Sequence, residues 1–175
     1  MSLPLPDRRF PAYSYVPGKY PHPQSDPLGH SFGHVPEKCD PLTPENALRH
    51  ATYLWGIQLF NHGYYWEAHE TWEQVWHACG RKRSAADYLK GLIKLAAAGV
   101  KSREGRPEGV ARHASRSAEL LRSVKVSLGG SNAAPFGLTL DSLINIAEHV
   151  ATHGGQYMNT SNAPVAATLP PLPDS

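Results

Sequence analysis

Proline confines the regular structure of this chain to its middle. Nine of the 16 prolines fall before residue 42, and four more fall after residue 163. Proline removes a backbone hydrogen-bond donor and restricts the residue before it, so neither end can form a continuous helix. The fold must therefore be built from the segment between them, which has three prolines and is long enough to bury a core.

The middle segment alternates between helical spacing and helix-breaking residues. Thr43-Pro44-Glu45 has the sequence of a helix start, and apolar residues then recur at three- and four-residue intervals. Glycine and proline interrupt this pattern several times. It predicts five helices, over residues 44–60, 64–79, 85–104, 108–127 and 139–152. No stretch alternates like a strand, so we expect an all-α bundle.

The chain divides into three parts: a proline-rich arm (residues 1–42), the helical bundle (residues 43–152) and a flexible tail (residues 153–175). The arm carries apolar anchors such as Phe10, Tyr13 and Tyr20, so we expect it to pack on the bundle. The tail ends in TLPPLPDS and lacks such anchors. We expect the tail to be disordered.

Two features bear on where the protein works. The opening MSLPLPDRRF has no apolar stretch typical of a signal peptide, and no run approaches the roughly 20 apolar residues that span a bilayer. Cys39 and Cys79 are too few for a disulfide framework and lack paired metal-ligand spacing. The sequence predicts a cytoplasmic protein with no membrane partner.

The second predicted helix, in the stretch FNHGYYWEAHETWEQVW (residues 60–76), mixes aromatic and charged residues. At about 100° per residue, His69 and Glu73 share one face with four aromatic residues, and Glu70 lies at its edge. Glu67 falls on the opposite side, where we expect it to face water. The aromatic lining consists of Tyr65, Trp66, Trp72 and Trp76.

Burial of this aromatic lining predicts a polar site inside the bundle. The rings gain free energy only by leaving water, so His69 and Glu73 are drawn out of solvent with them. An unpaired buried carboxylate costs several kcal/mol, so a partner must meet it. We expect a site made of His69, Glu70 and Glu73, with Lys94 of the third helix as the counter-charge.

A divalent metal is the other candidate partner. The string HExxE lacks the second histidine of zincin motifs and the Glu-x-x-His pair of di-iron bundles. Histidines of the arm, however, are spaced like ligands, and imidazole with carboxylate oxygens suits zinc or a similar ion. The candidate metal ligands are His69, Glu73, His22 and His30. Six other histidines are interpreted as surface residues: His50, His62, His77, His113, His149 and His153.

Two phrases of the chain resemble a known family, the domain of unknown function number 309. Its phrase G-x-Y/F-W-E-A-H-E-x-W-E-x-x-W is similar to residues 63–76, and its phrase F-L-Q-G-L-I-Q-L-A-A is similar to YLKGLIKLAA at residues 88–97. Lys90 and Lys94 stand where glutamine is usual. The resemblance covers about residues 43–151 and implies a small helical bundle; it carries over no catalytic residue, because the family has no established activity.

The sequence favours a module that binds a ligand or a divalent metal at the His/Glu site. The first alternative is a scaffold, in which the network only fixes helix packing and the surface binds a protein partner or a second copy. Nucleic-acid binding through Arg81–Lys125, which holds 12 Lys/Arg against 4 Asp/Glu, is a lower alternative. A metal-dependent hydrolase with Glu70 or Glu73 as base is another lower alternative. Its nucleophile would be a metal-bound water, because no serine or cysteine has a suitable neighbour in the sequence. The sequence leans toward binding rather than catalysis.

Overall fold

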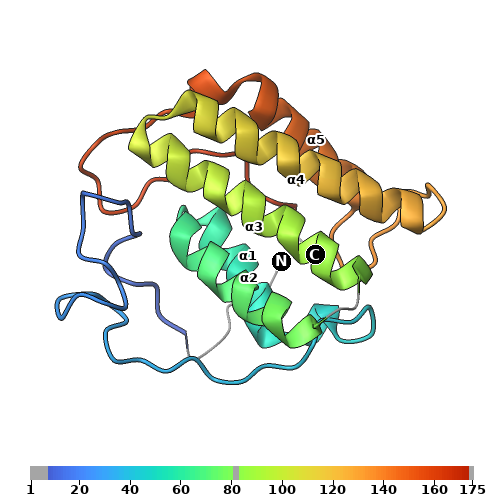
Figure 1. Ribbon diagram of the computed structural model, residues 1–175, viewed down its shortest axis with the longest axis horizontal. Coiled ribbons are helices and arrows are strands. Elements are labelled where there is room, and N and C mark those ends of the chain that lie inside the picture. The colour runs from blue at the N-terminus through green and yellow to red at the C-terminus, as the bar shows by residue number, and fades with distance from the viewer. Residues whose placement is uncertain (1–7, 81–82, 174–175) are drawn as a thin grey trace.

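The computed structural model describes residues 8–80 and 83–173, which form five α-helices, two short 3-10 segments and no strand. The helices are α1 (Ala51–Asn61), α2 (Tyr65–Cys79), α3 (Arg83–Glu104), α4 (Pro107–Ser127) and α5 (Leu140–Thr152). Each packs chiefly on its neighbours in the chain, so the helices lie side by side in chain order (Figure 1). The predicted all-α bundle is confirmed. Within the described residues, no helix has the length and apolar character needed to cross a bilayer.

The first helix starts later than the sequence predicts. The side chain of Asn46 accepts from the backbone N–H of Thr43 and donates to Pro41 O, which closes a turn ahead of the 3-10 segment η1 (Ala47–Arg49). Such local side-chain bonds compete with helix formation. Instead of Thr43, buried His50 caps α1 by accepting from the N–H of Tyr53, so it is not a surface histidine.

Two glycines set the position of α2 between its neighbours. A Cβ atom at Gly56 of α1 would lie 2.2 Å from Nε1 of Trp72, and one at Gly99 of α3 would lie 2.3 Å from the ring of Tyr65. Both aromatic side chains are fully buried, and Trp72 Nε1 donates to the carbonyl of Tyr53. These close approaches fix the rotation of α2 about its axis, and so determine which of its residues face the arm and the tail.

The tail differs from the disordered segment that the sequence predicts. After the 3-10 segment η2 (Gly154–Tyr157), it runs back along the bundle and buries Leu169 and Leu172. Tyr65 Oη accepts from the N–H groups of Thr168 and Leu169, both at 2.8 Å. The anchors are therefore two leucines and backbone hydrogen bonds, which a proline-rich composition conceals.

The arm runs beside α1 and α2, on the side away from α4 and α5 (Figure 1). The ring of Phe10 stacks on Tyr64 at 5.1 Å and lies 5.0 Å from Trp55 of α1. The arm also contacts the tail, because the N–H of Ser14 donates to Pro164 O at 2.9 Å. One edge of α2 thus lies under a layer of extended chain.

Candidate functional site

The two edges of α2 have different surroundings. Its buried apolar stripe consists of Tyr65, Ala68, Trp72, Val75 and Cys79. Ala68, Val75 and Cys79 share this stripe with a single indole, that of Trp72, so the centre of the stripe lies near Ala68, about 100° from Glu67. The sequence prediction places the centre of the buried stripe at the tryptophan side chains, which is closer to His69 than the observed centre. In the structure, His69 and Glu73 lie at one edge and Glu67 at the other.

Glu67 corrects the sequence prediction most clearly, because it does not point to water. The residue is 6% exposed and lies under the arm. One carboxylate oxygen accepts from Ser14 Oγ, and the other accepts from the N–H of Tyr15 and lies near His30 Nε2, each at 2.9 Å. Three partners satisfy this buried carboxylate, as its removal from water requires.

At the other edge, His69, Glu70 and Glu73 form an open cluster. His69 Nδ1 lies 3.4 Å from Glu70 Oε1, and His69 Nε2 lies 3.9 Å from Glu73 Oε1. Their side chains are 27%, 34% and 41% exposed, respectively. The predicted polar residues therefore come together, but at the rim of the bundle rather than inside it.

Lys94 makes no ion pair with Glu73 within the described part of the chain, so the expected counter-charge is not in contact with it. Lys94 is half-buried on α3 and acts on His113 of α4. Burial first, then the positive charges of Lys94, Arg112, Lys101 and His69, lower the pKa of His113. The His69 edge thus faces a group of cations, and His113 is not a simple surface histidine.

The aromatic lining divides between core and surface. Tyr65 and Trp72 are buried in the core, whereas Trp66 and Trp76 are half-exposed. Trp66 packs edge-on against Tyr15 of the arm, at 5.3 Å. The ammonium of Lys90 lies 5.3 Å from the ring of Trp76, a cation–π contact. Only part of the predicted lining is therefore next to the His69 cluster.

The arm histidines do not join His69 and Glu73. His30 contacts Glu67, at the opposite edge of α2. The ring of His22 packs on Trp66 at 5.5 Å, and its Nδ1 accepts from the N–H groups of Gln24 and Ser25. The four-ligand set of His69, Glu73, His22 and His30 is thus wrong in its arm members.

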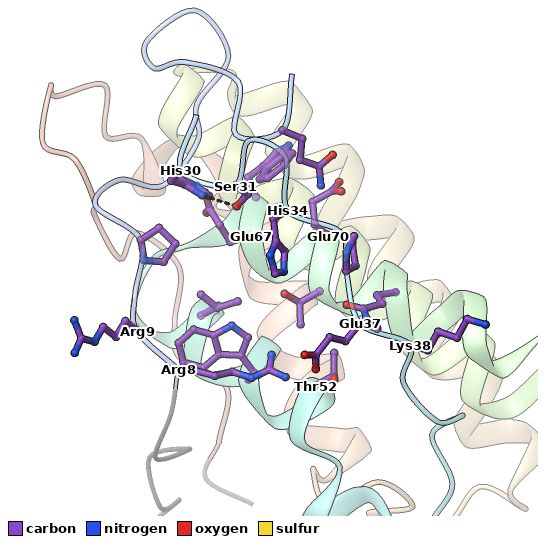
Figure 2. A pocket seen from close by; sticks show the side chains of 18 residues that line it. Arg8, Arg9, His30, Ser31, His34, Glu37, Lys38, Thr52, Glu67 and Glu70 are labelled. Carbon is purple, nitrogen blue, oxygen red and sulfur yellow. Dashed lines mark hydrogen bonds and ion pairs between the residues drawn. The ribbon is translucent and has the colours of Figure 1, made fainter. Parts of the chain in front are cut away.

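A cavity of about 660 Å³ lies between the arm and helices α1 and α2. His30, Ser31 and Glu67 lie together toward one end of it, while Arg8 and Thr52 lie toward the other (Figure 2). Trp55 and Trp66 contribute apolar wall, and Glu70 reaches the cavity from α2. The sequence alone does not place Glu67 in this cavity, because residues more than 40 positions apart line it.

Arg103 is a second residue whose position the sequence does not indicate. It is fully buried on α3, and its guanidinium donates to the carbonyls of Asn159, Ser161 and Ala163 in the tail. Its Nη1 has no hydrogen-bond partner among the described residues. Its position in a highly charged segment gave no sign that this arginine holds down the tail.

Much of the basic charge between residues 81 and 125 is already engaged within the molecule. Arg103 is buried, and four other basic residues form ion pairs: Lys101 with Glu104, Arg116 with Glu119, Arg122 with Glu148 and Lys125 with Asp141. Arg81 and Lys82 lie outside the described residues. These ion pairs leave less positive charge on this region to bind the phosphate groups of a nucleic acid.

The fold and the site define a small all-α bundle whose second helix carries a half-exposed His/Glu cluster. Residues 53–113, from α1 into α4, match the model of the family described as Domain of unknown function (DUF309). Over these residues the resemblance that the two phrases predict is confirmed. Among curated proteins, none matches the chain.

Proposed function

We propose that this bundle binds a divalent metal ion of the zinc type through His69, Glu70 and Glu73. The observation that carries the proposal is that one donor atom from each side chain lies within 4.8 Å of the other two. Zinc bonds of 2.0–2.2 Å in a tetrahedral site place donor atoms about 3.4 Å apart. Small rotations of the two carboxylates would close the site around an ion.

Two further features support metal binding. Nδ1 of His69 is buried and has no hydrogen-bond partner within the described residues, because Glu70 is near it but not aligned for a bond. The partial exposure of all three side chains leaves a path for the ion. Three protein ligands leave a fourth position for water, the arrangement of zinc sites that do chemistry.

A scaffold role is the second candidate, and the charges around His69 favour it. Lys94, Lys101 and Arg112 act on neighbouring His113, so the same cations can offset the carboxylates without a metal. They would also repel an incoming cation. In this reading the cluster only helps to orient α2 against α3 and α4.

Calorimetric titration of the metal-stripped protein with Zn²⁺, Co²⁺ and Mn²⁺ separates these candidates. Metal binding predicts one ion per chain, lost in both His69→Ala and Glu73→Gln. His153→Ala is the matched control, because His149 and His153 stack at 4.3 Å as another four-residue pair that could hold an ion. A complete absence of binding, or binding lost only in His153→Ala, would exclude the proposed site.

A further inference from the structure

Three side chains at the wall of the arm cavity form a hydrogen-bonded line. Ser31 Oγ lies 2.8 Å from His30 Nδ1, and His30 Nε2 lies 2.9 Å from Glu67 Oε1 (Figure 2). All three residues line the cavity between the arm and α2. A hydroxyl, an imidazole and a carboxylate in this order are the parts of an activated serine nucleophile.

The surrounding bonds define the direction of each proton. Ionised Glu67 can only accept, so His30 Nε2 carries the proton of the His30–Glu67 bond. When the ring is neutral, His30 Nδ1 has a free lone pair that accepts from the Ser31 hydroxyl. The imidazole is therefore in the tautomer that can take a proton from serine.

The line is held by a loop with internal backbone hydrogen bonds. The N–H of Ser31 donates to Pro23 O, and that of Gly29 donates to Asp26 O. A Cβ at Gly29 would lie 2.3 Å from the carbonyl oxygen of His22, so the loop closes only around glycine. The side chain of His30 is 10% exposed and packs against Tyr13. These contacts position the imidazole before any substrate arrives.

A role confined to holding the arm does not account for Ser31. The arm is held to Glu67 by Ser14, Tyr15 and His30, and the Ser31 hydroxyl contacts none of the Glu67 oxygens. Ser31 is half-exposed, at the cavity wall. Its hydroxyl is thus both activated and accessible, which a purely structural serine does not need.

We infer that Ser31 is the nucleophile of an acyl-transfer site, with His30 as general base and Glu67 as the residue that positions His30. The substrate class is a small carboxylic ester with an apolar acyl part, because Trp55, Leu59 and Trp66 supply apolar wall in the same cavity. Of the proposed metal cluster, Glu70 also reaches this cavity, whereas His69 and Glu73 do not line it.

The reaction divides into two matching steps. Ser31 Oγ adds to the ester carbonyl carbon while its proton passes to His30 Nδ1; the bond to the alcohol oxygen then breaks, and that oxygen takes the proton from His30. Water repeats the exchange on the acyl-serine, which releases the carboxylic acid and restores the hydroxyl. The side-chain amide of Gln24 lines the cavity and can donate to the oxyanion.

A fluorophosphonate probe, read by peptide mass spectrometry on the full chain, tests the inference. We expect one adduct, on Ser31, and hydrolysis of p-nitrophenyl acetate at least tenfold above that of Ser31→Ala. Ser25→Ala, an exposed serine of the same loop, should keep both properties. Matching circular dichroism spectra and unfolding midpoints would show that Ser31→Ala is folded.

The role of Glu67 is tested with two variants, one that changes its contact with His30 and one that changes only its contact with another arm residue. Glu67→Gln should lower the acylation rate at saturating ester about a hundredfold, whereas Ser14→Ala removes another donor to Glu67 and should leave that rate within threefold of the parent. Adduct formation that is absent, or that persists in Ser31→Ala, would overturn the inference, as would ester hydrolysis equal in the parent and Ser31→Ala.

Discussion

The two edges of α2 carry carboxylates in opposite situations. Glu67 is buried under the arm and has three partners contributed by residues 14, 15 and 30. Glu73 lies six residues further along the same helix, 41% exposed, and its only ion-pair contact among the described residues is His69 at 3.9 Å. One glutamate thus anchors an extended segment at one edge of α2, and another remains available to a ligand at the other edge.

This difference separates a carboxylate whose partners are fixed by the fold from one that can exchange partners. A carboxylate whose lone pairs are filled by fixed donors has little left to offer an ion, and its removal leaves those donors unpaired. A half-exposed carboxylate whose contact with a histidine is as long as 3.9 Å can change partners at small cost. We therefore expect mutations at the two edges to act on different properties.

Glu67→Ala should give the largest loss of stability. It leaves the hydroxyl of Ser14, the N–H of Tyr15 and the ring of His30 without their acceptor, so we expect a loss of about 3 kcal/mol in the free energy of unfolding. Glu73→Ala, the matched change at the open edge, should cost less than about 0.5 kcal/mol. Urea unfolding of the two variants measures the contrast, and equal losses would show that the edges do not differ.

Arg103→Met should come next, because it removes the donors that hold the tail. We expect a loss of about 2 kcal/mol in the free energy of unfolding, from three hydrogen bonds made by a charged group. Limited proteolysis should then cleave after residue 158 much faster than in the parent. Lys101→Met, a change at a partly exposed residue two positions earlier on α3, is the control. A tail equally protected in both variants would contradict this role of Arg103.

A smaller, pH-dependent effect is expected from His113→Gln. Burial and nearby positive charge lower the pKa of His113 below its ordinary 6.5, so just below pH 6.5 the unfolded chain binds the proton more readily than the folded one. Stability should therefore fall as the pH drops through 6.5 toward the folded-state pKa, and this part of the fall should be missing in the variant. Urea unfolding from pH 7.5 to 5.0 checks it; parallel curves for both proteins would refute it.

Lys94→Gln should have the smallest effect, and only on ligand binding. Loss of one positive charge near the His69 edge should raise the affinity for Zn²⁺ about twofold to fivefold, since partly exposed charges interact weakly. Calorimetric titration compares it with Lys90→Gln, whose parent ammonium lies over Trp76. If only Lys90→Gln raised the affinity for Zn²⁺, Lys94 would not be the charge that repels the ion.

The sequence predicts the parts of this molecule that depend on near neighbours. The five helices follow from apolar spacing and from glycine and proline breaks, and the family match over residues 53–113 follows from two short phrases. The His69, Glu70 and Glu73 cluster follows from positions one and four apart. Glu67 and Arg103 were not predictable, because their partners lie 37 to 60 positions away in segments without periodicity. The late start of α1 has a local cause, the hydrogen bond that the side chain of Asn46 makes with Thr43. The prediction gives more weight to the Thr43-Pro44-Glu45 pattern and so places the helix start too early.

The most direct test of the account is to observe the ring nitrogens of the histidines by ¹⁵N NMR while one equivalent of Zn²⁺ is added. We expect the His69 resonances to shift and those of His30, held between Glu67 and Ser31, to stay unchanged. Assignment through His69→Gln and His30→Gln makes the result unambiguous. Unchanged His69 resonances, or a shift of His30 in their place, would contradict the division of α2 into an open, metal-binding edge and a closed edge that the arm covers.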